Sequence, residues 1–147
     1  MKSSKWDTLW SSKKQDWTTP QDLFDNLNEE FHFNIDLAAN SSNTKCERFL
    51  GPGSPICEDF FKIECINDIA WLNPPYGKDL YKWVEKAYKE SLNGNTVVLL
   101  LPSRTDVKWF HDFCLKGEIR FLKGRLKFGE SKNSAPFGSI IVIFRPL

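Results

Sequence analysis

The stretch WLNPPYG, residues 71–77, restricts its own backbone enough to place the elements around it. Two consecutive prolines fix two φ angles at about −65° and remove two backbone donors, so the stretch cannot lie inside a helix or a sheet. A residue that precedes a proline prefers extended geometry, which places Asn73 at the end of a strand formed by residues 69–72. The sequence therefore predicts a rigid tip that presents an amide, a proline carbonyl and an aromatic ring.

This tip suits an exocyclic amine. The Asn73 side-chain oxygen and the Pro74 carbonyl can both accept hydrogen bonds from an –NH2 group, and Tyr76 can stack on the flat ring that carries it. The amino nitrogen of adenine or cytosine is a weak nucleophile because its lone pair is delocalised into the ring. Two acceptors at its hydrogens favour a more tetrahedral nitrogen, whose lone pair can attack an electrophilic methyl group. The alternative is structural, since a Pro-Pro pair between aromatic residues also stiffens a loop.

NPPY, residues 73–76, resembles the (D/N/S)PP(Y/F/W) motif of S-adenosylmethionine-dependent amino-methyltransferases. Further matching segments follow one another along residues 17–144, and their order is similar to that of phage-type, or Dam-like, DNA N6-adenine methyltransferases. These segments are WTTP, DLAAN, EDFF, WLNPPYG, LLLPSRTDVKWFH, FLKGRLKF and APFGSIIVIF. The resemblance implies that the catalytic residues are Asn73, Pro74, Pro75 and Tyr76.

The same resemblance implies S-adenosylmethionine as the cofactor, bound beyond the carboxyl ends of the strands. Its adenine amine would donate to Asp59, its adenine ring would pack on Phe60, and its ribose would bind Glu47. The full implied set is Trp17, Thr18, Thr19, Pro20, Asp36, Leu37, Ala38, Glu47, Asp59, Phe60 and Asn73. One departure is the missing acid-x-x-x-Gly-x-Gly loop, because no glycine follows Asp36 before Gly51. Phe60 suits core packing equally well.

Turn residues and apolar periodicity divide the chain into alternating strands and helices. Thr19 as N-cap, with Asp22 completing a capping box, opens a helix over 20–30. A second helix runs from the N-cap Asp79 to Gly94. The remaining expected elements are strands over 33–40, 47–50, 69–72, 96–101 and 139–144, a helix over 105–116, and a strand over 118–123 that continues through 124–128.

This alternation predicts an α/β fold. The family resemblance makes it a single Rossmann-like class I methyltransferase sheet, mostly parallel and closed by a C-terminal antiparallel hairpin. We expect an irregular N-terminal arm over 1–16 and one S-adenosylmethionine-dependent methyltransferase domain over 17–147. Such a chain has no room for a separate recognition domain, so we expect a short or relaxed DNA site preference.

Composition indicates a cytoplasmic globular protein without a metal or a membrane span. Hydrophobic residues make up 41% of the 147 residues and charged residues 27%, and no apolar run approaches the ~18 residues of a membrane helix. The cysteines show no CxxC or Cys/His metal spacing, which indicates reduced thiols. They are Cys46, Cys57, Cys65 and Cys114.

The net charge of +1 is unevenly distributed, because residues 101–147 hold nine Lys/Arg against four Asp/Glu. A local basic patch can bind a phosphate backbone without a basic overall pI. The candidate nucleic-acid-binding residues are Arg104, Lys123, Arg125, Lys127 and Lys132. On charge alone, a solvated lysine face at a strand edge is an equal alternative.

These features together predict methyl transfer from S-adenosylmethionine to the N6 amine of adenine in DNA, by base flipping and direct in-line transfer. The expected partner is DNA, and a homodimer is possible. Cytosine N4, RNA and protein glutamine are alternative acceptors for the same motif. A non-catalytic nucleic-acid-binding module on the same fold is the alternative of another class, and the missing glycine loop favours it.

Overall fold

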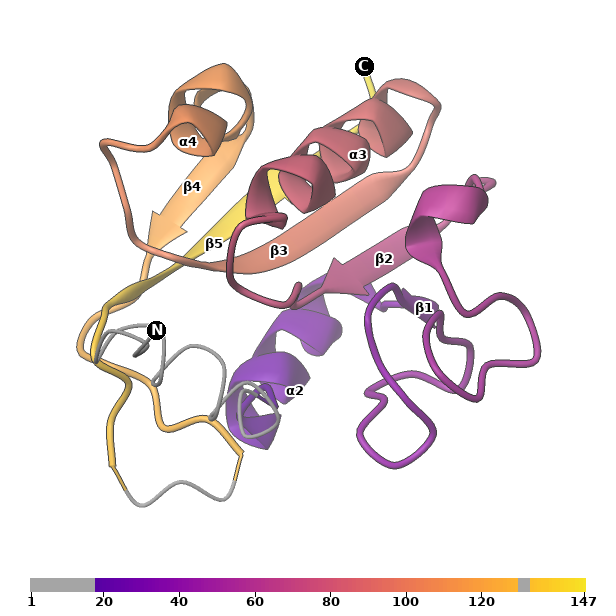
Figure 1. Cartoon of the computed structure of the whole chain (residues 1–147), viewed down its shortest axis with the longest axis horizontal. Helices are drawn as coiled ribbons and strands as arrows, with labels where there is room; N and C mark the ends of the chain where they lie inside the picture. The colour runs from indigo at the N-terminus through magenta and orange to yellow at the C-terminus, as the bar shows by residue number, and fades with distance from the viewer. Residues whose placement is uncertain (1–17, 130–132) are drawn as a thin grey trace, which may run out of the picture.

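The computed structural model describes residues 18–129 and 133–147, so the expected arm, Trp17 and Lys132 lie outside the described residues. The described chain forms one five-stranded sheet with the order β1-β2-β3-β5-β4 (Figure 1). Its strands are β1 (Ile35–Asp36), β2 (Ile69–Leu72), β3 (Thr96–Pro102), β4 (Glu118–Phe121) and β5 (Ser139–Phe144).

The sheet is mixed rather than mostly parallel. Within the described residues, β1, β2 and β3 pair in parallel, whereas β5 runs antiparallel to both β3 and β4. The expected C-terminal antiparallel hairpin is confirmed. The parallel share is smaller than expected because β5 inserts between β3 and β4 and makes two antiparallel pairings.

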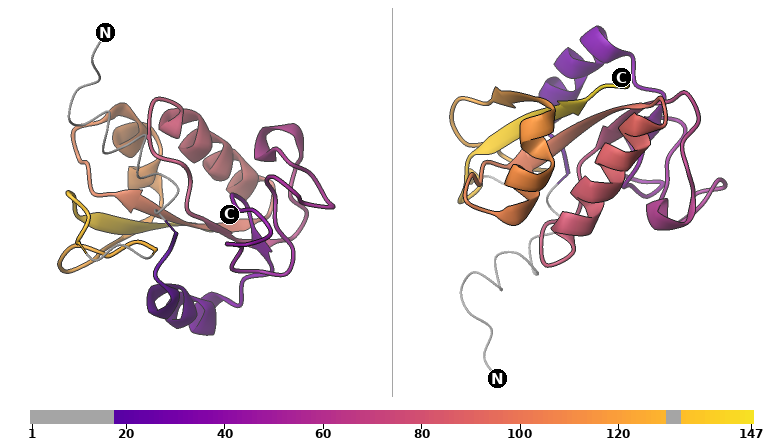
Figure 2. Two further views of the ribbon diagram at one scale, coloured as in Figure 1. Left: turned by 60° about the horizontal axis from the view of Figure 1, so that its bottom comes forward. Right: turned by 90° about the horizontal axis from the view of Figure 1, so that it is seen from above.

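Helices cover both faces of the sheet (Figure 2). On one face lie α3 (Leu80–Leu92) and α4 (Lys108–Asp112), and on the other lies α2 (Gln21–Phe31). Successive side chains of a strand point to opposite faces, so the apolar run of β3 is divided between two cores. Val97, Leu99 and Leu101 pack in the α3 core, while Val98 and Leu100 pack in the α2 core.

The carboxyl ends of β1 and β2 lie side by side, because the two strands are parallel and Asp36 is in register with Trp71. Asn73 follows β2 directly, as the proline pair requires. The backbone that leaves β1 at Leu37 therefore faces the tip that leaves β2, and ligands of open α/β sheets bind at this edge.

The capping box expected at α2 does not form. Pro20 is the N-cap and has no side-chain cap, while the Asp22 carboxylate accepts from the adjacent N–H of Leu23 at 2.9 Å. The physical reason is that the helix begins one residue later than expected, so Thr19 lies one residue before the N-cap, and its hydroxyl accepts from the Asn73 side chain. The helix bounds were predicted to within one residue.

Several strand and helix lengths differ from the expectation. The strand expected over 33–40 is limited to β1, and residues 47–50 contribute only a bridge between Asp36 and Phe49. The helix expected over 105–116 breaks at Phe113 (φ −126°) into α4 and the short helix η3 (Cys114–Lys116). Beyond β4 the chain leaves the sheet, because Gly124 takes a left-handed φ of +77°.

Candidate active site

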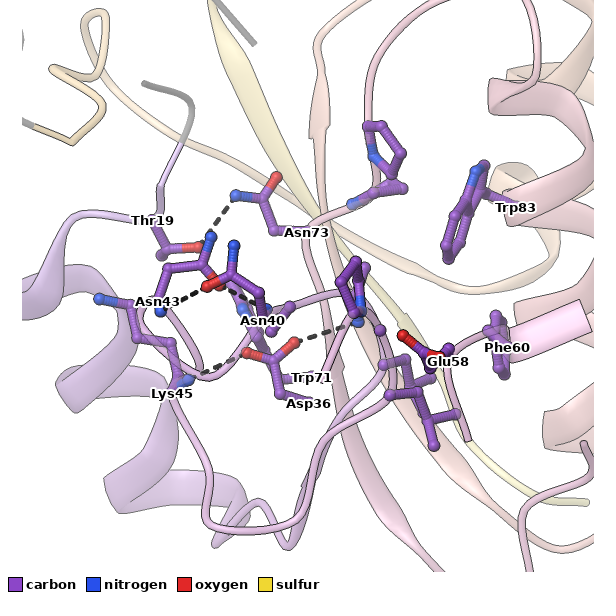
Figure 3. A pocket seen from close by; sticks show the side chains of 18 of the residues that line it. Thr19, Asp36, Asn40, Asn43, Lys45, Glu58, Phe60, Trp71, Asn73 and Trp83 are labelled. Atoms are coloured by element: carbon purple, nitrogen blue, oxygen red, sulfur yellow. Dashed lines mark hydrogen bonds between the residues drawn. The ribbon is translucent and has the colours of Figure 1, made fainter. Parts of the chain in front are cut away.

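A cleft of about 810 Å³ opens at the carboxyl ends of β1 and β2 (Figure 3). Ten of the residues implied by the family resemblance line it, namely Thr18, Thr19, Asp36, Leu37, Ala38, Asp59, Phe60, Asn73, Pro74 and Pro75. Its two ends differ in chemistry. One end carries the polar side chains of Thr19, Asp36 and Asn73, and the other carries the aromatic rings of Phe60 and Trp83.

At the polar end, the Asn73 amide is held by a hydrogen bond from its Nδ2 to the Thr19 hydroxyl oxygen at 3.0 Å. Thr19 is buried, and the bond joins segments 54 residues apart in the sequence. The amide nitrogen points toward Thr19 and the amide oxygen points away from it (Figure 3). This orientation matters because only the oxygen can accept from an amine.

Asp36 secures the loop that follows β1. Its carboxylate accepts from the N–H of Ala38 at 3.2 Å and from the N–H of Lys45 at 3.0 Å. The side chain is buried, and this burial raises the pKa of Asp36 to about 6 although both hydrogen bonds lower it. Asp36 thereby holds the turn between Asn40 and Lys45 against the strand end, where it forms the polar wall of the cleft.

Gly51 lets two loops that line the cleft approach each other closely. Its φ is +140°, and a Cβ atom there would lie 1.8 Å from the carbonyl oxygen of Ala39. The Ala39 N–H also donates to the Leu50 carbonyl at 3.0 Å, which brings the two loops together along the cleft. Only glycine fits this position. The sequence shows that Gly51 is the first glycine after Asp36, but it does not show that Gly51 contacts Ala39.

At the aromatic end, Phe60 and Trp83 face each other with ring centroids 5.9 Å apart and an interplanar angle of 24°. Phe61 meets Trp83 edge-on at 4.9 Å. Phe60 is buried within the core cluster, so core packing and cleft lining are combined in one ring. The sequence analysis did not assign Trp83 to the cleft, because helical periodicity does not distinguish a ring that packs in the core from one that lines a cleft.

Asp59 lines the cleft beside these rings. Its Oδ1 accepts from the N–H of Phe61 at 2.9 Å and caps the short helix η2 (Phe60–Lys62). Glu47, the expected ribose-binding acid, is exposed and lies outside the residues that line the cleft. Glu58 does line it, and its carboxylate accepts from the N–H of Gly53 at 3.2 Å.

Tyr76 does not line the cleft but is buried in the core. The Tyr76 ring is buried and meets the rings of Phe128 and Phe137 edge-on, with centroids 6.5 and 5.7 Å apart. Its hydroxyl donates to the Leu100 carbonyl at 3.2 Å, and burial raises the pKa of Tyr76. The residues of the NPPY motif therefore have two environments. Asn73, Pro74 and Pro75 line the cleft, whereas Tyr76 packs in an aromatic cluster with Phe128 and Phe137.

The candidate phosphate contacts within the described residues are all exposed, namely Arg104, Lys123, Arg125 and Lys127. Arg120, on the same stretch, has a different environment. Its guanidinium binds Glu30 at 2.7 Å and Glu118 at 2.6 Å, which ties β4 to the end of α2. Arg120 therefore forms ion pairs with carboxylates of the protein itself.

Other chemistries find little support in the part of the chain that the structure describes. No group of His, Cys, Asp and Glu there could hold a metal ion, and no helix there is long and apolar enough to cross a membrane. Burial raises the pKa values of Cys46, Cys65 and Cys114 to about 12, so these thiols are protonated at neutral pH. A thiolate is the reactive form of cysteine, and these thiols are not poised as nucleophiles.

Comparison with known proteins shows the family of this chain. Over 153 residues the chain is 31% identical to the DNA N-6-adenine-methyltransferase of Haemophilus phage HP1, which covers 95% of this chain and 85% of that protein. It is 24% identical to the DNA N-6-adenine-methyltransferase of Escherichia phage T1 over 156 residues. This aligned region covers 89% of this chain and 63% of that protein. Residues 7–147 match the profile of the family described as DNA N-6-adenine-methyltransferase (Dam). The chain therefore belongs to the DNA N-6-adenine-methyltransferase (Dam) family.

Proposed function

We propose that this adenine-specific DNA methyltransferase binds S-adenosylmethionine in the cleft and delivers its methyl group to an adenine amine held at Asn73 and Pro74. The observation that carries this proposal is the oriented amide of Asn73, which stands at the end of β2 in a cleft with an aromatic far end. The family match supplies the reaction class.

The residues of the cleft fit this cofactor. An adenine ring suits the pair Phe60 and Trp83, and the Asp59 carboxylate can accept from its amine. Glu58, in place of the expected Glu47, can accept from ribose hydroxyls. In this proposal the methionine part lies among Thr18, Asp36, Leu37 and Ala38 at the polar end, where Thr19 holds the Asn73 amide. Pro20, which the resemblance also implied, is the N-cap of α2 and lies outside the residues that line the cleft.

When bound, the cofactor supplies an electrophilic methyl group on a sulfonium. The chain contributes positioning and electrostatics rather than a covalent intermediate. The Asn73 side-chain oxygen and the Pro74 carbonyl accept from the two hydrogens of the target amine and direct its lone pair toward the methyl group. The adenine has to leave the duplex for this, because its amine lies inside the helix.

Tyr76 is the stacking surface of the base site in this proposal. A base that stacks on Tyr76 takes the place of Phe128 or Phe137, because both rings contact Tyr76 directly. Base entry therefore requires the Phe128 or the Phe137 ring to move off the Tyr76 ring. The exposed Lys123, Arg125 and Lys127 lie on the neighbouring stretch, where they can hold the phosphates of the distorted strand.

We further infer that the sheet is the core of a Rossmann-like class I methyltransferase domain spanning 17–147. Three parallel strands, helices on both faces, and a ligand cleft at the carboxyl ends of the strands support this inference. The open cleft at the strand ends supports a cofactor-binding enzyme over a module that has lost the cofactor site. A homodimer stays a prediction, which light scattering can test.

The experiment that tests the function is transfer of labelled methyl from S-adenosylmethionine to unmethylated DNA, followed by digestion to nucleosides. We expect N6-methyladenine from the wild type and none from Asn73→Ala. Asn93→Ala is the matched control, because Asn93 is exposed at the end of α3 and lies outside the cleft. Label found in cytosine, RNA or protein would mean that the acceptor is not adenine. If no label were transferred to DNA, RNA or protein, the proposal that this protein is a catalyst would be overturned.

A further inference from the structure

Thr19 directly precedes the N-cap residue of α2 and does not cap the helix. Threonine directly before a proline at a helix start is a favourable N-cap, yet α2 has no side-chain cap and its N-cap residue is Pro20. The Thr19 hydroxyl oxygen instead accepts from Asn73 Nδ2 at 3.0 Å. The side chain of Thr19 therefore supports Asn73 rather than the end of the helix.

The backbone around Thr19 is fixed on both sides. The Thr18 carbonyl accepts from the N–H of Gly129 at 2.8 Å, and the Pro20 carbonyl accepts from the N–H of Phe24 at 3.2 Å. Thr19 itself is 4% exposed. A side chain held in this way has little freedom to follow a moving partner, so it acts as a fixed support for the Asn73 amide.

The orientation of that amide decides what it can do. The side chain of asparagine has an acceptor on one branch and a donor on the other, and a half turn exchanges them. The hydrogen bond to Thr19 directs the side-chain nitrogen of Asn73 toward Thr19 and the side-chain oxygen away from Thr19 (Figure 3). Catalytic groups must be held close to their productive geometry, and a misplacement of about 1 Å can reduce the rate about 100-fold.

We propose that Thr19 is a positioning residue for methyl transfer, whose hydroxyl sets the orientation of the Asn73 amide. This inference rests on the proposed function, since it gives Asn73 its meaning in the reaction. The proposed role distinguishes Thr19 from its neighbour Thr18. Thr18 and Thr19 both line the cleft, but the hydroxyl of Thr19 holds the Asn73 amide, so the side chain of Thr19 acts through Asn73.

The test compares Thr19→Val, which keeps the shape of the side chain but removes the hydroxyl, with Thr19→Ser, which keeps the hydroxyl. We expect Thr19→Val to lower kcat by roughly 10- to 100-fold at saturating cofactor. Its Kd for S-adenosylmethionine should stay within about twofold of the wild type, because the proposed loss is in the orientation of Asn73. Thr19→Ser should recover most of the lost kcat. Thr96→Val, at the far end of β3, is the matched control for the same substitution.

A second measurement does not depend on activity. The side-chain NH2 resonances of Asn73, assigned by their loss in Asn73→Ala, report the hydrogen bond directly in the protein alone. We expect slow exchange of the bonded hydrogen in the wild type and in Thr19→Ser, and faster exchange in Thr19→Val.

The outcomes separate the possible roles of Thr19. Unchanged kcat in Thr19→Val, or unchanged exchange of the Asn73 amide, would overturn the proposal. A raised Kd for the cofactor with normal kcat at saturation would make Thr19 a cofactor contact, and failure of Thr19→Ser to recover activity would make it structural. If the wild type formed no N6-methyladenine while the exchange pattern held, the proposed function would fail and the positioning role in catalysis with it.

Discussion

The Tyr76 hydroxyl donates to the Leu100 carbonyl at 3.2 Å, which ties the last residue of the NPPY motif to the central strand β3. The hydroxyl is therefore engaged within the protein, and only the ring is left as a surface for a base. Leu100 belongs to the α2 core, so the bond links the motif to the packing of the whole sheet.

Tyr76→Phe should keep kcat within about threefold of the wild type and lower the free energy of unfolding by about 1 kcal/mol, the net value of one hydrogen bond. Tyr76→Ala removes the ring and should reduce transfer far more. Chemical denaturation and methyl transfer assays check the two effects. A large loss of kcat in a stable Tyr76→Phe would show that the hydroxyl takes part in the reaction.

Trp83→Ala should weaken cofactor binding about 3- to 10-fold, because one aromatic face is worth about 0.5–1.5 kcal/mol beyond area burial. Trp83→Phe should retain most of the affinity. Calorimetric titration with S-adenosylmethionine gives the Kd values. The control is Tyr81→Ala on the same helix, since Tyr81 packs on Phe113 outside the cleft. Equal affinities for Trp83→Ala and the wild type would move the adenine site elsewhere.

Asp59→Ala and Asn73→Ala should separate binding from transfer. We expect Asp59→Ala to raise the cofactor Kd, because its carboxylate lines the aromatic end of the cleft. Asn73→Ala should abolish transfer and leave cofactor binding nearly intact. The same calorimetric and transfer assays apply, and equal losses of cofactor affinity in both variants would show that the two ends of the cleft are wrongly assigned.

Asp36 should make stability fall as pH rises. Its pKa is about 6 in the folded protein against an ordinary 3.8, so the folded state holds the proton more tightly than the unfolded state. This contribution is complete below pH 3.8 and is lost as the pH rises through 6, with a total of about 3 kcal/mol.

Asp36→Asn lacks this titration. Its free energy of unfolding, relative to the wild type, should therefore rise by about 2 kcal/mol between pH 4 and pH 7 in urea denaturation. A constant difference across that range would show that Asp36 titrates normally in the folded protein.

The exposed cations should determine the salt dependence of DNA binding. Arg125→Ala and Lys127→Ala should each reduce the slope of log K against log salt by about 1 if each holds one phosphate. Arg120→Ala serves as the control, because its guanidinium is bound by Glu30 and Glu118. Fluorescence anisotropy at several salt concentrations measures the slopes, and an effect only in Arg120→Ala would reverse the assignment.

Local physics is enough for much of this protein. The proline pair alone puts Asn73 at a strand end, since the restriction acts on neighbouring dihedral angles. The apolar runs of β3 and β5 predict buried strands, and β5 has the predicted bounds. Asp36 and Asp59 could be assigned to the cleft because each lies in a short contiguous sequence motif, DLAAN and EDFF.

The tertiary structure decided what depends on residues distant in the sequence. Thr19 had a local use as a cap and a distant use as a partner of Asn73, and only the folded chain brings that partner to 3.0 Å. Gly51 became a requirement only when Ala39 lay against it, and Trp83 became part of the cleft only when α3 docked beside Phe60. The sequence by itself determined the motif and the strand that carries it. Long-range packing decided which neighbours orient the motif, because those contacts arise only when the chain closes on itself.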